Sequence, residues 1–464
     1  MNFKYPASPT SPRVFFLSSP SMLDSRASLP IKFIVVGASV SGLACGYALR
    51  KAGHEVVLLE KTDGKIKTEG AIRSPPNMTR ILSGWPDGPA FLKQHATKCS
   101  GISLRRGDTL EPMGYMKLYE QIMSELQADF LILQHDDLRR YLTSICLASG
   151  VVIKYACQAV EVKLTDGSVN IVVANGNTLH GDIVVGADGH NSLVRGIVAE
   201  GDLEATHTVT GASISISTKD IRKHLDFQAL WNPNEFTLWM GNGSNIIGTL
   251  DPNAETLNIA ICAPTNLGIA EGDGYTNKPL ANKMPFDLSG YDTRLQKLIQ
   301  LGHICYPTVQ HVFEQDDVVG LDGMAVLVGD AAHSVLIHGS HNSSMAMEDA
   351  ATLGCLFSRL SNRKQIPMLL HAYHEIRHSR TSSTQDSEYQ WLVQTALPPG
   401  TLRDGRDATL NATLSKAFED FDNCGNSEMI QQMWAEYLVM FGYNAAEEVD
   451  NWRSMWGSVV DQLV

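Results

Sequence analysis

Residues 31–61, IKFIVVGASVSGLACGYALRKAGHEVVLLEK, decide the fold of this chain. The apolar run at residues 31–36 predicts a buried strand, and residues 41–52 have the composition of a helix that stops at Gly53. A second apolar run at residues 55–59 predicts another strand. The order of strand, glycine-containing turn, helix and strand is typical of an α/β protein.

The turn before the helix has small residues where a phosphate would approach. Gly37 permits a tight turn, the small Ser39 lets the backbone come close to a pyrophosphate, and Gly42 lets helix and strand pack closely. Ser41 lies at the start of the helix, where free N–H groups and the positive end of the dipole attract an anion. The turn predicts a dinucleotide site, and the alternative is an ordinary β-α-β unit that binds no nucleotide.

An acidic residue follows the second strand. Glu60 lies 18 residues after Gly42, where a carboxylate accepts hydrogen bonds from a ribose 2′-OH. We expect Glu60 and the adjacent Lys61 to contact the cofactor. No arginine stands just beyond Glu60 to receive a 2′-phosphate, so the tightly held nucleotide is predicted to be FAD or NAD and not NADP.

Two further segments each combine a β-branched strand, small residues and an aspartate: residues 181–195, GDIVVGADGHNSLVR, and residues 326–333, VLVGDAAH. With the first motif, they resemble the single-component flavoprotein aromatic hydroxylases of the para-hydroxybenzoate and salicylate hydroxylase type. The resemblance implies that Asp188 and Gly189 lie near the FAD pyrophosphate and the nicotinamide path. It also implies that Gly329 and Asp330 contact the ribityl chain of the flavin.

The resemblance extends over nearly the whole chain. Residues 70–82, GAIRSPPNMTRIL, resemble the family segment beside the isoalloxazine, which places Ala71 at the cofactor. Residues 134–142, QHDDLRRYL, resemble a helix start at which an arginine contacts FAD. This chain has His135 at that position, and Arg139, one helical turn later, is the expected substitute. The alternative is that Arg139 and Arg140 lie on a solvated helix face.

The chain departs from the family pattern after the third motif, in residues 333–350, HSVLIHGSHNSSMAMEDA. Ile337 replaces a proline, and residues 339–343 replace a glutamine- and glycine-rich stretch of the family. We expect a helix from Ser344 with Asn342 or Ser343 as its N-cap, whose dipole stabilises negative charge on the flavin.

Two histidines in this departing segment are the catalytic candidates. By resemblance, Ser343 and Ser344 contact the cofactor, and His338 and His341 lie close to the isoalloxazine. The two histidines either form a catalytic proton shuttle or belong to a simple turn. Their spacing does not predict a metal site, because it provides no supporting carboxylate.

Strand and helix patterns predict the domain organisation. Residues 1–30 read as a disordered tail, and residues 31–200 with 311–365 are expected to form a discontinuous Rossmann-like FAD-binding domain. Period-two segments within residues 201–310 predict an interleaved, mainly antiparallel β-sheet substrate domain, and residues 366–464 read as helical. The expected fold class is therefore α/β.

Composition excludes several classes of partner. A net charge of −13 argues against binding to nucleic acid or an anionic membrane. The eight cysteines show no disulfide or zinc pattern, which favours a reducing, cytoplasmic location. No segment is predicted to span a membrane. The sequence does not indicate the oligomeric state, or whether residues 1–21 belong to the functional protein.

Substrate residues are less clearly indicated. Trp231, Phe236, Trp239 and Met240 form either an aromatic wall of the substrate pocket or part of the sheet core. Many relatives carry an arginine on the first strand of this sheet that binds an acidic substrate, and residues 214–217 contain none. A larger, mostly apolar natural product is therefore favoured over a small carboxylate.

The family resemblance implies a reaction. NAD(P)H binds transiently and reduces FAD, and O2 then forms a flavin C4a-hydroperoxide that hydroxylates or epoxidises an electron-rich small molecule of secondary metabolism. One alternative is an FAD-dependent dehydrogenase, oxidase or cyclase that inserts no oxygen. The other is a flavin-binding regulator without enzymatic activity.

Overall fold

The computed structural model describes residues 26–462, apart from residues 66–69, 166, 200–204, 228–229, 231, 233, 252–254, 266, 268–285, 303–304, 314–316, 335–338 and 417–427. Most of the predicted N-terminal tail, Trp231, Ile337 and His338 lie outside the described residues.

The first layer is a six-stranded, mainly parallel sheet with the order β18-β19-β12-β1-β2-β8. Its strands are β1 (Lys32–Val36), β2 (Glu55–Leu59), β8 (Val152–Lys154), β12 (Ile183–Gly186), β18 (Val319–Gly320) and β19 (Ala325–Leu327). In the register of this sheet, Val36 lies opposite both Leu59 and Gly186, and Gly186 lies opposite Leu327. The carboxyl ends of four strands therefore meet at one edge, which is where open α/β sheets bind ligands.

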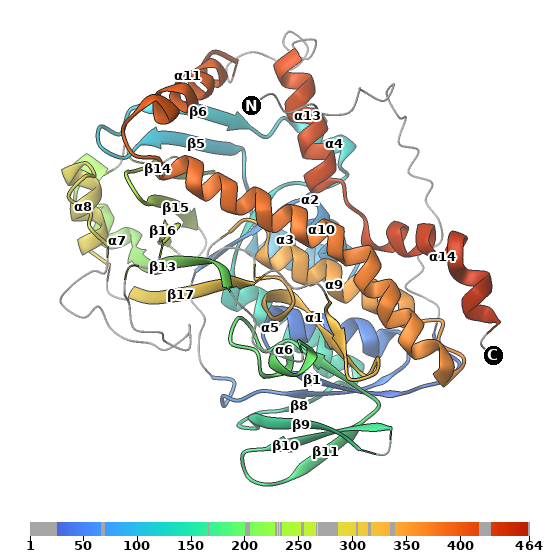
Figure 1. Cartoon of the computed structure of the whole chain (residues 1–464). Coiled ribbons are helices and arrows are strands. Elements are labelled where there is room, and N and C mark those ends of the chain that lie inside the picture. The colour runs from blue at the N-terminus through green and yellow to red at the C-terminus, as the bar shows by residue number, and fades with distance from the viewer. Residues whose placement is uncertain are drawn as a thin grey trace.

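Helices cover one face of this sheet, and a small antiparallel sheet lies against the other (Figure 1). The covering helices are α1 (Val40–Lys51), α5 (His135–Ser149), α9 (Asn342–Phe357), α10 (Ile366–Thr395) and α14 (Ala445–Asp461). The small sheet consists of β9 (Ala159–Thr165), β10 (Ser168–Val173) and β11 (Thr178–Gly181). Helix α1 is buried on nearly all sides because it packs between α5 and α9, which explains its mixed, glycine-containing sequence.

A seven-stranded sheet forms the second unit, with the order β17-β13-β16-β15-β14-β5-β6. Its strands are β5 (Gly101–Arg106), β6 (Pro112–Lys117), β13 (Ala205–Ser217), β14 (Glu235–Met240), β15 (Asn245–Asp251), β16 (Thr256–Ala263) and β17 (Cys305–Phe313). All neighbours pair antiparallel except β14 with β5. Helices α7 (Thr218–Ile221) and α8 (Thr293–Gln300) cover its outer face together with the short 3-10 helix η2 (Leu225–Phe227).

A third, three-stranded sheet joins the two units. It consists of β3 (Ala71–Ser74), β4 (Thr97–Lys98) and β7 (Leu131–Gln134). Helices α2 (Pro76–Ser83), α3 (Gly88–His95) and α4 (Glu120–Glu125) lie between its strands in the chain. In the first unit, α6 (Leu193–Val198) packs against β9 and β19, the 3-10 helix η3 (Gly329–Ala331) against α9, and the 3-10 helix η4 (Arg363–Gln365) against α10.

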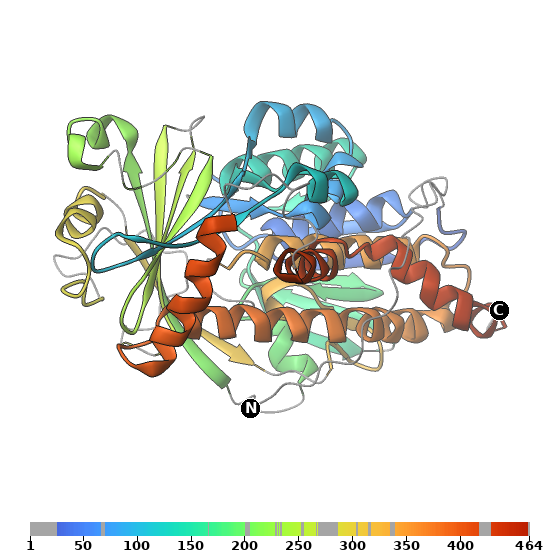
Figure 2. The same ribbon diagram turned by 90° about the horizontal axis from the view of Figure 1, so that it is seen from above.

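The C-terminal region is helical and binds the two units together. The long helix α10 runs from the first unit toward the seven-stranded sheet, and α11 (Thr401–Lys416) packs against β6 (Figure 2). Helix α13 (Glu428–Phe441) follows and leads to α14. These features confirm the expected fold class, an α/β unit combined with a mainly antiparallel sheet and a helical C-terminal region. Among the described helices, none is long and apolar enough to cross a membrane.

Candidate active site

The three sequence motifs converge because they follow strands whose ends are in register. A Cβ atom built on Gly37 would lie 2.3 Å from the carbonyl oxygen of Ala187, which directly precedes Asp188. A Cβ atom on Gly329 would lie 2.7 Å from the Cβ of Ser41. The first motif therefore touches both the second and the third, at points where only glycine fits.

The first turn has the geometry of an anion site. Gly37 has a φ of +102°, and Ser39 is the N-cap of α1 without forming a side-chain capping bond. The first N–H groups of α1 therefore have no side-chain acceptor from the N-cap. The Glu60 carboxylate lies beside this turn, because its Oε2 accepts from the Ala38 N–H at 3.1 Å. Lys61 is exposed next to it.

The second motif has a structural role that the sequence analysis did not foresee. The Asp188 carboxylate accepts from the Leu193 N–H at 2.8 Å and from the Ser192 hydroxyl, and so satisfies the first N–H of α6, whose N-cap is Ser192. Gly189 adopts a φ of +80° in the same turn, with open space where a side chain would project. Arg195 of α6 donates to the backbone carbonyl of Asp330 at 3.4 Å, which ties the second motif to the third.

The third motif forms η3 at the end of β19. Gly329 has a φ of +58°, and its N–H donates to Asp349 Oδ2 at 2.8 Å. Burial raises the pKa of the Asp330 carboxyl to about 6, although the charges of His333 and Arg195 oppose that rise. Near neutral pH, a carboxyl with this pKa can be protonated or ionised, so it can either donate a hydrogen bond to a polar ligand or accept one.

Helix α9 begins earlier than expected. It starts at Asn342, and its N-cap is His341, so the predicted start at Ser344 with Asn342 or Ser343 as N-cap is wrong. The physical reason is that the His341 carbonyl accepts the first helical backbone hydrogen bond, from the Met345 N–H at 2.8 Å. The Ser344 hydroxyl also donates to this carbonyl, at 3.0 Å. The His341 side chain forms no capping bond, so Ser343 lies in a first turn without a side-chain cap from that residue.

His341 lies in a buried polar cluster. Its side chain is buried, its Nε2 atom lies 3.8 Å from Glu388 Oε1, and its ring stacks on Phe441 at a centroid distance of 5.9 Å. Burial, together with the charges of Arg380 and Arg73, lowers the pKa of His341 to about 3. The imidazole is therefore neutral at neutral pH.

Arg73 and Glu388 belong to this cluster, and sequence reasoning missed both. The Glu388 carboxylate accepts from the Ser340 N–H at 2.8 Å, and burial raises its pKa. Arg73 donates to the Gly339 carbonyl at 3.4 Å and lies over the Phe236 ring at 5.2 Å. Arg73 is only two residues from Ala71, a signal that could have been used, whereas no motif marks Glu388 in its helix.

The arginines of α5 occupy different environments. Arg139 is partly buried and donates to the Gly64 carbonyl at 3.4 Å, near the segment that follows Glu60. Its Nε atom is buried and has no hydrogen-bond partner among the described residues. Arg140 is 63% exposed and pairs with Asp137. The solvated-face interpretation therefore holds for Arg140, whereas Arg139 has a buried donor that a ligand could satisfy.

The aromatic residues of β14 divide between the two faces of their sheet. Trp239 is fully buried in the core between the sheet and α8. Phe236 lies on the opposite face, in a cluster with Phe130 and Phe441. The core interpretation is therefore correct for Trp239, and Phe236 is placed at the edge of the polar cluster by its contact with Arg73.

These residues fit a dinucleotide cofactor on three independent observations. The first turn is tight at Gly37, and α1 begins after it without a side-chain cap. The acid expected for a ribose lies at the end of β2, and a buried arginine donor next to Gly64 lacks a partner. Within the described ranges, no group of three or more His, Cys, Asp and Glu side chains is suited to bind a metal ion.

Comparisons with known proteins agree with this geometry. A family model described as an FAD binding domain matches residues 31–274. The FAD-dependent monooxygenase atnJ of Arthrinium sp is 25% identical over 83% of this chain and 90% of its own length. The 3-hydroxybenzoate 6-hydroxylase 1 of Aquipseudomonas alcaligenes is 23% identical over 76% and 86%. A salicylate hydroxylase substrate complex shares the fold, with a TM-score of 0.67, 17% identity and coverage of 91% and 97%.

The fold is the one shared with that salicylate hydroxylase structure, and three nucleotide-binding motifs converge in it. The chain belongs to the FAD binding domain family, and it is an enzyme of the FAD-dependent monooxygenase class with FAD as its cofactor.

Proposed function

We propose that this enzyme uses NAD(P)H and O2 to hydroxylate or epoxidise an electron-rich, mostly apolar small molecule of secondary metabolism. The observation that carries the proposal is the meeting of three motifs at one sheet edge, beside the buried cluster of Arg73, His341 and Glu388. The described residues form one β-α-β nucleotide unit, so NAD(P)H would bind transiently rather than in a fold of its own. Relatives named as monooxygenases in fungi and in Streptomyces support the reaction class.

The cofactor contacts follow from the position of each residue. The first turn and α1 would hold the pyrophosphate, Glu60 the ribose, and Asp330 the ribityl chain. Ala71 at the start of β3 and the first turn of α9 would flank the isoalloxazine. The proposed cofactor residues are Gly37, Ser39, Ser41, Gly42, Glu60, Lys61, Ala71, Arg139, Asp188, Gly189, Gly329, Asp330, Ser343 and Ser344. The redox chemistry itself comes from bound FAD.

The chain supplies electrostatic support and a proton path. The N-terminus of α9 directs a positive dipole end at negative charge that develops on the cofactor. We assign His341 a catalytic role, because its Nδ1 atom is buried without a hydrogen-bond partner among the described residues. A neutral imidazole can accept a proton from a substrate hydroxyl at Nδ1 while it releases its Nε2 proton toward Glu388, whose Oε1 lies 3.8 Å away. The ring then does not have to remain doubly protonated, which its lowered pKa would oppose. His338 is the second proposed catalytic residue.

The seven-stranded sheet provides the expected substrate wall. Ser213, Ala260 and Ile247 are opposite one another on three neighbouring strands, and all three are partly exposed. A Cβ atom on Gly70 would lie 3.9 Å from Ser213 Oγ, so this face adjoins the segment that begins β3. The wall mixes small polar and apolar side chains, which suits a natural product with a few polar groups.

The proposal is tested by following flavin absorbance. The FAD-loaded enzyme is mixed anaerobically with NADPH and, separately, with NADH, and bleaching is expected with at least one of them. Labelled O2 is then admitted with a panel of phenols, indoles and polyketides, and one labelled atom is expected in a product. Bleaching with products that never contain label would favour the alternative, a dehydrogenase, oxidase or cyclase. The observation that favours this alternative is the segment around His341, which departs from the family pattern.

The role of His341 is tested in the same assay with the His341→Gln variant. We expect FAD to remain bound, because the side chain lies outside the contacts of Gly37 and Gly329 that bring the motifs together. Product formation should fall by roughly 10²-fold, the range that general acid–base catalysis contributes. An unchanged rate with bound FAD would contradict the assignment.

A further inference from the structure

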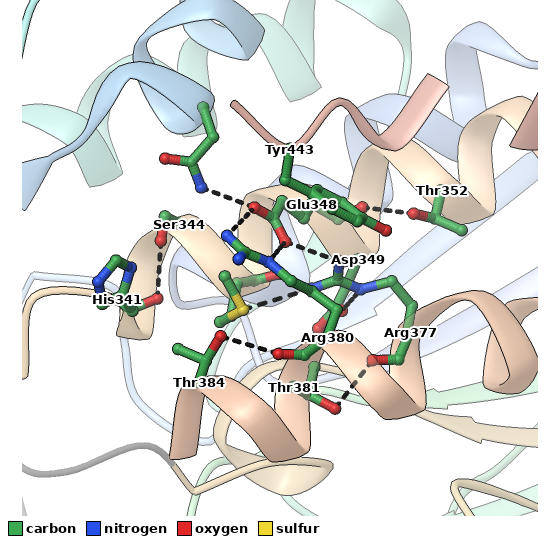
Figure 3. Close-up of polar contacts among 12 residues, drawn as sticks. His341, Ser344, Glu348, Asp349, Thr352, Arg377, Arg380, Thr381, Thr384 and Tyr443 are labelled. Carbon is green, nitrogen blue, oxygen red and sulfur yellow. Dashed lines mark hydrogen bonds and ion pairs between the residues drawn. The ribbon is translucent and has the colours of Figure 1, made fainter. Parts of the chain in front are cut away.

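Two adjacent carboxylates, Glu348 and Asp349, are fully buried in the middle of α9 (Figure 3). Burying two negative charges is costly unless each receives a matched partner and further hydrogen bonds. Arg377 and Arg380, one turn apart on α10, supply the matching positive charges. Both carboxylates pair with Arg377, but their remaining contacts go to different parts of the molecule.

Glu348 faces the C-terminal part of the molecule. It accepts from Asn77 Nδ2 at 2.6 Å, from Arg377 Nη1 at 2.6 Å and from Arg380 Nη2 at 3.2 Å. Arg380 also donates to the carbonyl of Met440 at 2.7 Å and lies 4.8 Å below the Tyr443 ring. These contacts hold α9, α10 and the chain after α13 together.

Asp349 faces the third motif. Its Oδ2 accepts from the Gly329 N–H at 2.8 Å and contacts His333 Nε2 at 2.6 Å, and its Oδ1 accepts from Arg377 Nε at 2.8 Å. The His333 N–H in turn donates to the Gly329 carbonyl at 2.9 Å. One carboxylate therefore forms hydrogen bonds with both ends of the short turn that carries Asp330.

The hydrogen bonds of Asp349 hold the turn at Gly329, where the backbone has little freedom to move. Gly329 has a φ of +58° and is packed against Ser41 of α1, so a small rotation of the turn would collide with the first motif. His333 and Arg377 hold the pKa of Asp349 well below its usual range, against the opposing effect of burial. A charged acceptor forms shorter and stronger hydrogen bonds than a neutral one.

We propose that Asp349 is a positioning residue for the flavin site: its carboxylate fixes the Gly329–Asp330 turn, and Arg377 holds the carboxylate. Glu348 serves instead the attachment of the C-terminal segment. The inference uses the binding of FAD and does not depend on the proposed reaction, so either can fail without the other.

The test compares Asp349→Asn with Glu348→Gln. Each variant removes one buried negative charge that pairs with Arg377, but only Asp349 contacts the turn. The asparagine amide cannot accept from the Gly329 N–H, His333 and Arg377 together. We expect the dissociation constant of FAD to rise about tenfold or more in Asp349→Asn, with a changed visible circular dichroism of the bound flavin. In Glu348→Gln both should stay near the wild-type values, while the melting temperature falls.

Equal changes in both variants, or unchanged FAD binding and flavin dichroism in Asp349→Asn, would overturn the proposal. If Asp349→Asn does not fold, His333→Ala provides a second test, because it removes one contact of Oδ2 and leaves the Arg377 pair intact. The expected change is smaller and in the same direction, and wild-type FAD affinity with wild-type dichroism in that variant would equally contradict the positioning role.

Discussion

Single buried ionisable residues decide how the cofactor-free protein responds to pH. In the fold, burial raises the pKa of Asp330 to about 6, whereas an unperturbed aspartate has a pKa of about 3.9. The folded state therefore binds a proton more tightly at this carboxyl than the unfolded state does. The contribution of Asp330 to stability increases as pH falls from about 7 to about 5, and it is unfavourable at neutral pH.

We expect Asp330→Asn to stabilise the FAD-free protein at pH 7, to lose about half of that advantage by pH 5, and to lose the rest as the pH approaches about 4. The melting temperature of variant and wild type is measured across this range, and their difference is the quantity of interest. The difference is used because His341 and His135 have pKa values lowered to about 3 and about 4, so their contributions to stability decrease as the pH falls. These contributions are the same in variant and wild type and cancel in the difference. The exposed Asp386 provides the control, and Asp386→Asn should show no such trend. A constant difference for Asp330→Asn would contradict the argument.

Asp349 has the opposite sign and a different pH window. Its pKa is held below the usual range, so it contributes stability above the unfolded pKa of about 3.9 and loses that contribution as pH falls below it. Between pH 5 and pH 7 it stays charged in both states. Its titration therefore does not disturb the comparison made for Asp330.

At the scale of elements, helices α9 and α10 are joined by a buried ion network rather than by apolar packing alone. Arg377 is 2% exposed, and burial opposes its charge, yet Glu348 and Asp349 raise its pKa well above the usual range. Removing one member of such a network leaves the other charges buried without compensation. The stability of the pair of helices therefore depends on Arg377 more than on any exposed ion pair.

We expect Arg377→Met to lower the free energy of unfolding by about 3–5 kcal/mol, measured by urea denaturation of the FAD-loaded enzyme. The matched control is Arg140→Met on α5, since Arg140 also pairs with a helical carboxylate but is 63% exposed. That change should cost at most about 0.5 kcal/mol. Similar losses of stability in the two variants would show that the buried network contributes no more to stability than the exposed ion pair of Arg140.

At the scale of the whole molecule, the sequence predicted those parts of the site that each depend on one local stretch. The turn at Gly37, the acid at Glu60 and the aspartate motifs follow strand ends, and parallel strands bring their ends to one edge. Arg73, His341 and Glu388 lie on three elements far apart in the chain, and no spacing rule connects them. The contact of Asp188 with the start of α6 and the start of α9 also escaped prediction, because individual hydrogen bonds decide them.

The last element before α14 reaches the site from the far end of the sequence. Phe441 ends α13, stacks on His341 and meets Phe130 edge to face at 5.8 Å. Its carbonyl accepts from Arg80 at 3.2 Å, which fixes the backbone at this point. The ring therefore supports His341 from the C-terminal region, so the helical remainder of the chain contributes to the proposed active site.

We expect Phe441→Leu to free the His341 ring and to increase the hydrogen peroxide released per NAD(P)H oxidised, measured with a peroxide-specific dye. The control is Phe357→Leu in α9, whose ring packs edge to face on Phe33 at 5.2 Å in the core of the first unit. Both variants should lose about 1–2 kcal/mol of stability, because each loses buried ring contacts. Only Phe441→Leu touches a site residue, so equal peroxide release in both would mean that lost stability, and not the position of His341, controls the outcome. The visible circular dichroism of the bound flavin is also compared between Phe441→Leu and Phe357→Leu in the absence of NAD(P)H, and a change is expected only in Phe441→Leu.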